Sequence, residues 1–226
     1  MATNYKPKNY TTPIGNLHYG FLRPNHQKNL ERDVTKPPKM GYSVTLVLDK
    51  DSLAHKELEQ AVKEEWKRFK DLNPNVKGMP TTFPIKEIFE KHPTEKDEDG
   101  EPVKIPTGKV GIQAKTTSIV KGSGGRPDFE KTISIFDHKG TDVTNIYNNA
   151  KWAIGNDTTG RIIGSLYAGT HPSGSSYVSL FLNAVQIAKL DKYEGASIEV
   201  DAIDGDDFGD DDFSAPAPLD TSRVEM

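Results

Sequence analysis

The stretch Tyr177–Leu190, YVSLFLNAVQIAKL, is the longest apolar-rich run in the chain and limits most strongly what the chain can fold into. Its first half alternates with the period of two that is typical of a β-strand. The apolar phase then moves by one position near Asn183–Ala184. One extra residue produces such a move because it swaps the two faces of a strand, and the usual device is a β-bulge. The pattern therefore predicts a long, strongly bent strand of the kind that closes a small barrel.

Five further segments show strand alternation, namely residues 17–21, Tyr42–Asp49, Lys109–Val120, Lys131–Asp137 and Arg161–Tyr167. Between the second and third of them, apolar residues recur every three or four positions from Leu58 to Leu72, which predicts one amphipathic helix. Asp51 or Ser52 can cap this helix. The order of two strands, a helix and then a run of strands favours a small α+β barrel over a doubly wound sheet.

Three segments lack a clear period. Residues 73–108 contain six prolines, so we expect irregular structure there, with a short helical turn near Ile85–Phe89 and a loop tip at Lys96–Glu101. An irregular link is expected over residues 143–156. Residues 1–15 are polar and carry two prolines, which predicts a mobile arm.

The net charge of −4 hides an uneven distribution. Residues 199–226 carry ten acidic residues and one basic residue, which leaves residues 1–198 with 23 acidic and 28 basic residues. A weakly basic body suggests a polyanionic partner, and the acidic tail suggests a mimic of one. Charge alone is equally compatible with a solubilising tail on an ordinary domain. Phe208 and Phe213 interrupt the aspartates, however, and phenylalanine adds nothing to a purely solvating tail. The tail is expected to be disordered in the free state.

No pattern of catalytic or metal-binding residues is visible. The chain has no cysteine, which excludes disulfides and thiolate metal sites. Its six histidines are scattered, and no pair has the spacing of metal ligands. Gly155–Ile162 has the glycine spacing of a phosphate loop, but Arg161 and Ile162 replace the lysine and hydroxyl residues, and a strand follows. We therefore expect no enzyme, metal or cofactor. We also expect no transmembrane helix, since no apolar run approaches about 18 residues.

Basic residues are interleaved with aromatic residues in the second half of the chain. Lys109, Lys115, Lys121, Arg126 and Lys131 lie on or between adjacent expected strands, and Lys151 and Trp152 precede Arg161. Several aromatic residues fall at strand ends or in loops, including Phe21, Tyr147, Tyr167 and Tyr177. Single-stranded nucleic acid is bound by this combination, with cations for the phosphates and flat rings for the bases. Packing in the core or at its rim is the competing explanation for each ring.

Four stretches together resemble the phage single-stranded DNA-binding proteins of the T7 type. YSVTLVLDKDS, followed by the amphipathic helix, resembles the family's second strand and helix. ISIFDHKGTDV resembles its strand–turn segment, and RIIGSLYAG with YVSLFLNAVQIAKL resembles its paired final strands. The resemblance covers about residues 15–213. One departure is that an aromatic residue closes the chain in T7-type members, whereas here Phe213 is followed by SAPAPLDTSRVEM.

The resemblance implies a mainly β, α+β fold. Residues 16–195 would form an OB-fold barrel of five to six strands with one inserted helix, after the flexible arm of residues 1–15 and before a disordered acidic tail of residues 196–226. The protein would coat and protect single-stranded DNA, without strong sequence preference, in phage DNA replication, recombination and repair. It would act in the cytoplasm of the infected bacterium, without a membrane.

The candidate DNA-binding residues are Phe21, Lys109, Lys115, Lys131, Tyr147, Lys151, Trp152, Arg161 and Tyr167. Among them, Phe21, Tyr147, Trp152 and Tyr167 are the stacking candidates. The candidate partner-binding residues in the tail are Asp206, Asp207, Phe208, Asp210, Asp211, Asp212 and Phe213. The tail would compete for the DNA groove and recruit DNA polymerase and other replication proteins, and a homodimer is left open.

Two other classes of function remain open from the sequence. One is a structural or adaptor protein whose β-domain binds another protein and whose tail serves solubility. The other is an enzyme with a dispersed site, which is disfavoured because no nucleophile, metal cluster or cofactor loop is visible.

Overall fold

A computed structural model describes residues 5–31, 34–76, 80, 83–122, 124, 126–171 and 174–194. By its internal contacts the chain divides into two units, Met1–Gly195 and Ala196–Met226. All of the described residues belong to the first unit. The expected acidic tail lies outside the described residues.

The described part of the chain is mainly β-structure. Its strands are β1 (Lys8–Thr11), β2 (Gly15–Phe21), β3 (Lys28–Asn29), β4 (Met40–Asp49), β5 (Ile85–Lys96), β6 (Pro102–Thr117), β7 (Ile119–Val120), β8 (Phe129–Glu130), β9 (Ser134–Phe136), β10 (Ala153–Ile154), β11 (Thr159–Thr170), β12 (Ser176–Lys189) and β13 (Lys192–Tyr193). Its helices are α1 (Leu53–Leu72) and α2 (Thr144–Asn149).

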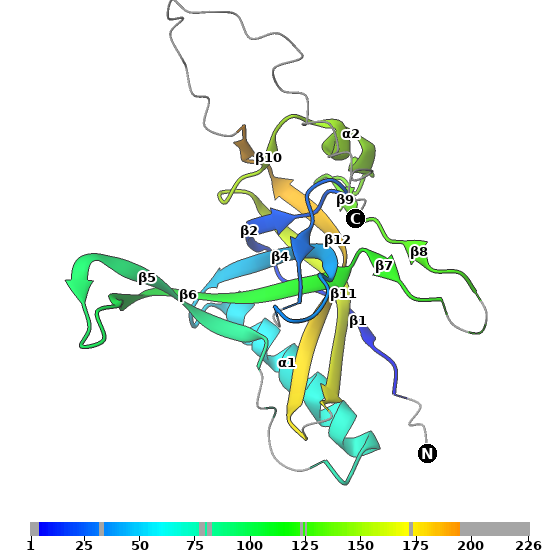
Figure 1. Cartoon of the computed structure of the whole chain (residues 1–226), viewed down its shortest axis with the longest axis horizontal. Helices are drawn as coiled ribbons and strands as arrows, with labels where there is room; N and C mark the ends of the chain where they lie inside the picture. Colours follow the sequence, from blue (N-terminus) through cyan, green and yellow to red (C-terminus); the bar gives the residue numbers. More distant parts are fainter. Residues whose placement is uncertain are drawn as a thin grey trace, which may run out of the picture. The chain divides into compact units, whose positions relative to one another are not determined.

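Five strands close into a ring in the order β2, β4, β6, β12 and β11, with β11 returning to β2 (Figure 1). All neighbours in the ring are antiparallel except β6 and β12, which are parallel. The side chains that point into the ring, such as Val44, Ile112 and Leu182, are fully buried. A five-stranded barrel of this kind is an OB fold, which confirms the expected architecture. The inserted helix, α1, lies between β4 and β6.

The bend in β12 occurs where the apolar pattern shifts. Leu182 pairs with Gly164 and Ala184 pairs with Ile163, so the register skips Asn183, as expected for a bulge. The strand partner has no room for a side chain there, since a Cβ added to Gly164 would lie 1.9 Å from the carbonyl oxygen of Phe181. The predicted bent strand and its bulge are therefore confirmed.

Helix α1 matches the predicted amphipathic helix. Its first turn is capped by Ser52, whose Oγ accepts a hydrogen bond of 3.1 Å from the backbone N–H of His55. Leu58, Val62 and Trp66 are buried, as the apolar stripe requires. Leu72, the last residue of that stripe, is instead 48% exposed because it lies at the end of the helix.

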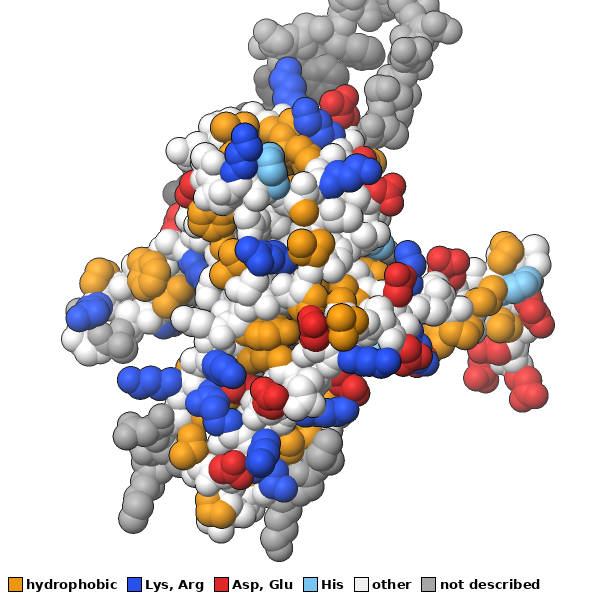
Figure 2. Space-filling model, turned by 180° about the vertical axis from the view of Figure 1, so that it is seen from behind, with side chains coloured by type: hydrophobic (Ala, Val, Ile, Leu, Met, Phe, Trp, Pro, Cys, Tyr) orange, Lys and Arg blue, Asp and Glu red, His pale blue; other side chains and the backbone are white. Residues whose placement is uncertain are grey.

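The segment expected to be irregular, residues 73–108, instead contributes a long hairpin of β5 and β6 that projects from the barrel (Figure 1). No helical turn forms at Ile85–Phe89. The ladder tolerates Pro93 because its register is interrupted between Lys91 and Lys96. The predicted loop tip is present as a turn, in which the N–H of Gly100 donates to the carbonyl of Asp97. Figure 2 shows acidic side chains gathered at the end of this hairpin.

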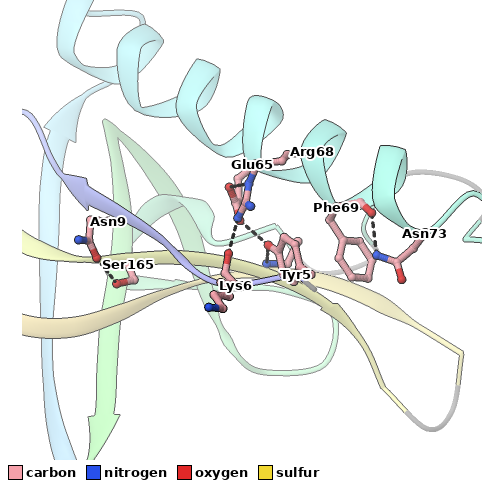
Figure 3. A network of polar contacts seen from close by, with 9 residues as sticks. Tyr5, Lys6, Asn9, Glu65, Arg68, Phe69, Asn73 and Ser165 are labelled. Atoms are coloured by element: carbon pink, nitrogen blue, oxygen red, sulfur yellow. Dashed lines mark hydrogen bonds and ion pairs between the residues drawn. The ribbon is translucent and has the colours of Figure 1, made fainter. Parts of the chain in front are cut away.

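Within the expected mobile arm of residues 1–15, the structure describes residues 5–15, and several of them contact β11 and α1. Strand β1 pairs with residues 163–166 of β11. The Tyr5 hydroxyl donates to Glu65 of α1 and accepts a 2.7 Å hydrogen bond from the N–H of Ala168 (Figure 3). Arg68 binds the Glu65 carboxylate and the carbonyl of Lys6. A four-residue strand held by its neighbours carries too short a pattern to be recognised in the sequence.

The expected irregular link over residues 143–156 contains α2 and β10. The expected strand Lys131–Asp137 is shorter, with β9 covering Ser134–Phe136. The interior of the barrel is therefore as predicted, whereas several short outer elements were not visible in the sequence.

Candidate nucleic-acid interface

A row of four residues crosses the outer wall of the barrel. Phe21 of β2 lies opposite Ser43 of β4, and Ser43 lies opposite Lys115 of β6. Lys115 is in turn paired with Phe181 of β12. Residues directly opposite one another on neighbouring strands share a face of the sheet. We call these residues the wall row. They place a lysine between two aromatic rings.

Phe21, Lys115 and Phe181 of the wall row face outward, whereas Ser43, which separates Phe21 from Lys115, is only 1% exposed. Val44, Ala114 and Leu180 are fully buried in the core. Phe181 is 39% exposed, and the side chains of Phe21 and Lys115 are partly exposed. The barrel wall thus carries an accessible ring beside a cation, the combination that single-stranded nucleic acids bind.

A groove adjoins the wall row where the edge of β6 changes partner from β5 to β12. Lys115, Gln113 and Thr45 line it from β6 and β4. Lys86 and Ile88 line it from β5, Ser179 and Leu180 from β12, and Phe83 and Pro84 from the segment before β5. Glu87 also lines the groove, and its carboxylate pairs with Lys50. The groove thus offers two ammonium groups, an amide and one paired carboxylate above an apolar floor. This chemistry fits a chain of phosphates with attached bases.

Phe21 sits at one end of the wall row, under the loop that follows β2. The His26 ring lies 4.9 Å from the Phe21 ring, and the Lys28 Nζ lies 5.5 Å above it. A cation over a ring face is an attractive arrangement, so the loop adds charge to this end of the row.

Phe181 and Tyr167 begin a chain of rings at the other end. Their centroids are 5.9 Å apart, and the Tyr167 ring also contacts Tyr177 at 6.2 Å and Tyr5 at 5.3 Å. Tyr167 is half-buried by these contacts. Burial raises the pKa of the Tyr177 phenol, so this phenol stays neutral at ordinary pH.

Three further predicted cations lie on or beside the barrel in different circumstances. Lys109 of β6 lies opposite Asp49 of β4. Burial of the His18 ring lowers its pKa, and the charge of Lys109 lowers it further. The Lys131 ammonium donates to three oxygens, those of Thr116, Leu182 and Asn183, and thereby holds the bulge of β12. Burial lowers the pKa of Lys131. Arg161 is exposed and donates to Gln186 at 2.9 Å.

The other predicted residues lie around α2, where Arg23 of the loop after β2 contacts Tyr147 and Trp152. Tyr147 is only 2% exposed, so its ring is part of the core and is not open to a base. The Arg23 guanidinium lies 4.4 Å from the centroid of the Tyr147 ring, and the Lys192 Nζ lies 5.2 Å from that of Trp152. The two rings are 5.7 Å apart. We call this group the α2 corner. Lys151 is exposed beside it.

The structure therefore brings Phe21, Lys115 and Tyr167 onto one wall. It places Tyr147, Lys151 and Trp152 in the α2 corner, which adjoins the loop after Phe21 through Arg23. The predicted tail residues, Asp206 to Phe213, lie outside the described residues. Phe181 and Lys86 were missed. Phe181 could have been found, because the alternation of Tyr177–Leu190 places it on the polar side of its strand. Lys86 could not, because its strand was not recognised.

Among the described residues, no group of three or more histidine, aspartate or glutamate side chains could hold a metal ion. In the same part of the chain, every helix is too short or too polar to cross a membrane.

Comparison with known proteins gives a match in structure but not in sequence. No protein-family model matches the chain, and no curated protein matches it in sequence. The solved structure of gp2.5, a single-stranded DNA-binding protein encoded by bacteriophage T7, is similar with a TM-score of 0.54 at 14% identity, over 89% of this chain and 100% of that chain. The fold is shared with phage single-stranded DNA-binding proteins.

A second similar structure is the single-stranded DNA-binding protein of bacteriophage Enc34 in complex with ssDNA. Its TM-score is 0.51 at 14% identity, and the match covers 83% of this chain and 89% of that chain. The resemblance first drawn from short motifs is thus confirmed at the level of the fold. Since the identity is low, the residues that bind a ligand in this chain have to be argued from its own surface.

Proposed function

We propose that this protein binds single-stranded DNA along the outer wall of its barrel. The observation that carries the proposal is the wall row, in which Lys115 lies between Phe21 and Phe181 on an OB barrel. OB folds bind oligonucleotides on this same face, formed by the second and third strands of the ring. The likeness to two phage proteins that bind single-stranded DNA supports the assignment.

Bases would stack on Phe181 and on the accessible part of Phe21. The phosphates would be paired by Lys115 and Lys86, with Lys109 and Arg161 extending the cationic wall. Stacking on a ring tolerates every base, because each base has a π-face. Binding would therefore depend little on sequence.

The biological role that fits this binding is the coating and protection of single strands in phage DNA replication, recombination and repair. The acidic tail, with Phe208 and Phe213, would compete with DNA for the wall and recruit DNA polymerase and other replication proteins. Its carboxylates and rings imitate the phosphates and bases of a strand.

Titration of the full chain with oligo-dT at two salt concentrations tests the binding. We expect quenching of tryptophan fluorescence and an affinity that falls steeply with salt, because phosphate contacts release counterions. Neither binding nor quenching at low salt would overturn the proposal and favour an adaptor that binds another protein.

Truncation after Gly195 tests the role of the tail. The truncated protein should bind oligo-dT more tightly in a gel shift, and it should bind a replication polymerase less well in a pull-down. Unchanged or weaker DNA affinity would show that the tail does not compete with DNA.

A further inference from the structure

A second groove lies beside the first, on the C-terminal half of α1. It is lined by Lys63, Trp66, Lys67, Lys70 and Asp71 of the helix and by Phe83. Phe83 also lines the groove on the barrel wall, so the two grooves meet at this residue. A polymer that fills the first groove has a direct continuation into the second.

The lysines of this groove are spaced to follow a polyanion. Lys63, Lys67 and Lys70 are separated by four and three residues, and residues at this spacing share one face of a helix. Seven residues of helix rise about 10 Å, over which a nucleic acid strand presents more than one phosphate. Acidic residues are interspersed with these lysines along the helix.

The interspersed acids do not cancel the charge of the groove. Glu59 pairs with Lys63 at 3.0 Å, but both side chains are well exposed, and an exposed pair of this kind is weak. Among the described residues, Asp71 is the one acidic residue in the lining, against three lysines. Lys67 and Lys70 therefore keep the groove positive beside Phe83.

Trp66 gives the groove an aromatic wall. Its ring is 4% exposed and lines the groove, and its indole Nε1 is buried without a hydrogen-bond partner within the described part of the chain.

We infer that single-stranded DNA leaves the barrel wall over Phe83 and continues along α1, with its phosphates on Lys63, Lys67 and Lys70. This inference rests on the proposed function and adds the helix insertion to the binding track. A nucleic acid fits better than an acidic protein segment because one continuous polyanion can occupy both grooves through their shared residue.

The test replaces the three lysines together, Lys63→Gln, Lys67→Gln and Lys70→Gln, and measures affinity for oligo-dT of increasing length. The wild-type affinity should rise with length as the strand reaches the second groove. The variant should bind short oligonucleotides normally but lose that rise, and its salt slope on long oligonucleotides should fall by about 2, at ~0.7 per phosphate contact.

A matched control removes the same charge elsewhere, through Lys56→Gln, Lys91→Gln and Lys104→Gln. Lys56 lies on the first turn of α1, and the other two lie on the projecting hairpin. The control should behave like wild type at every length. Three results would each overturn the inference. The triple variant and the control could lose the same affinity, the triple variant could bind long oligonucleotides as tightly as wild type, or it could lose as much affinity for short oligonucleotides as for long ones. Absence of binding by the wild type would instead refute the proposed function.

Trp66 gives a second readout, because the chain has two tryptophans and Trp152→Phe leaves Trp66 alone. In this background, fluorescence should change when a long oligo-dT binds and stay constant when a short one binds. A constant signal with both, despite tight binding of the long strand, would show that DNA does not reach the helix groove.

Discussion

The wall row and the α2 corner are built from the same types of residue but differ in how those residues are used. In the wall row, Phe181 is 39% exposed beside the cation of Lys115. In the α2 corner, Tyr147 is buried, and Arg23 and Lys192 already lie over its ring and that of Trp152. The first arrangement leaves ring surface for a base, whereas the second satisfies its rings within the protein.

The difference shows that pairing cations with rings does not by itself define a nucleic-acid site. The Arg23 guanidinium also donates to the carbonyl of Trp152, so the α2 corner holds the loop after β2 against the link after α2. We therefore expect changes in the α2 corner to act on stability and changes in the wall row to act on DNA affinity.

The largest effect is expected from Tyr147→Ala. Removal of a buried aromatic side chain should lower the free energy of unfolding by about 3–5 kcal/mol, measured by chemical denaturation. The fraction that remains folded should bind oligo-dT with wild-type affinity. A stable variant with weak DNA binding would break the distinction between the two regions.

Phe181→Ala should weaken binding to oligo-dT by about 1–3 kcal/mol, the loss of one stacked base. That range corresponds to roughly 5- to 150-fold in Kd. A suitable control is Phe129→Ala, because Phe129 is also exposed but lies on β8. Equal losses of affinity in the two variants would show that exposed rings contribute to DNA binding wherever they lie on the surface.

Lys115→Gln should lower the slope of log affinity against log salt by about 0.7, because one phosphate contact is lost. Lys151→Gln, beside the α2 corner, should leave the slope unchanged. Titrations at four salt concentrations measure both. A larger change of slope for Lys151→Gln than for Lys115→Gln would place the DNA path at the α2 corner instead of the barrel wall.

The smallest effect concerns alkaline pH. Burial raises the pKa of Tyr147, and the Arg23 charge offsets only part of that rise. As pH increases past about 10, the unfolded phenol ionises before the folded one, so the folded state loses stability. Tyr147→Phe should therefore lose less stability than wild type above pH 10, as measured by denaturation at several pH values. Parallel pH curves for the two proteins would show that Tyr147 does not contribute.

The barrel could be predicted because the apolar pattern of its bent strand reveals where the strand bends. The apolar phase of Tyr177–Leu190 shifts where the bulge lies. The apolar residues of α1 recur every three or four positions, which identifies the helix equally clearly. The β5–β6 hairpin could not be predicted, since its projecting strands are exposed and interrupted by prolines. Strand β1 is too short for a pattern.

The candidate site was only partly predictable for a related reason. Alternation placed Lys115 on the polar side of its strand, which the structure bears out. Whether the Tyr147 ring is buried or exposed depends on packing between segments that are distant in sequence, as its contact with Arg23 shows. A ring in an irregular link can be exposed or buried, and no local pattern distinguishes the two.

The pairing of β1 and β2 with β11 also bears on how the molecule is made. The N–H of Ile162 donates to the Thr12 hydroxyl across 150 positions of sequence. Strands β1 and β2 are thus synthesised long before their partner β11. Contacts so distant along the chain favour slow folding. The barrel can close only after β11 and β12 have been translated.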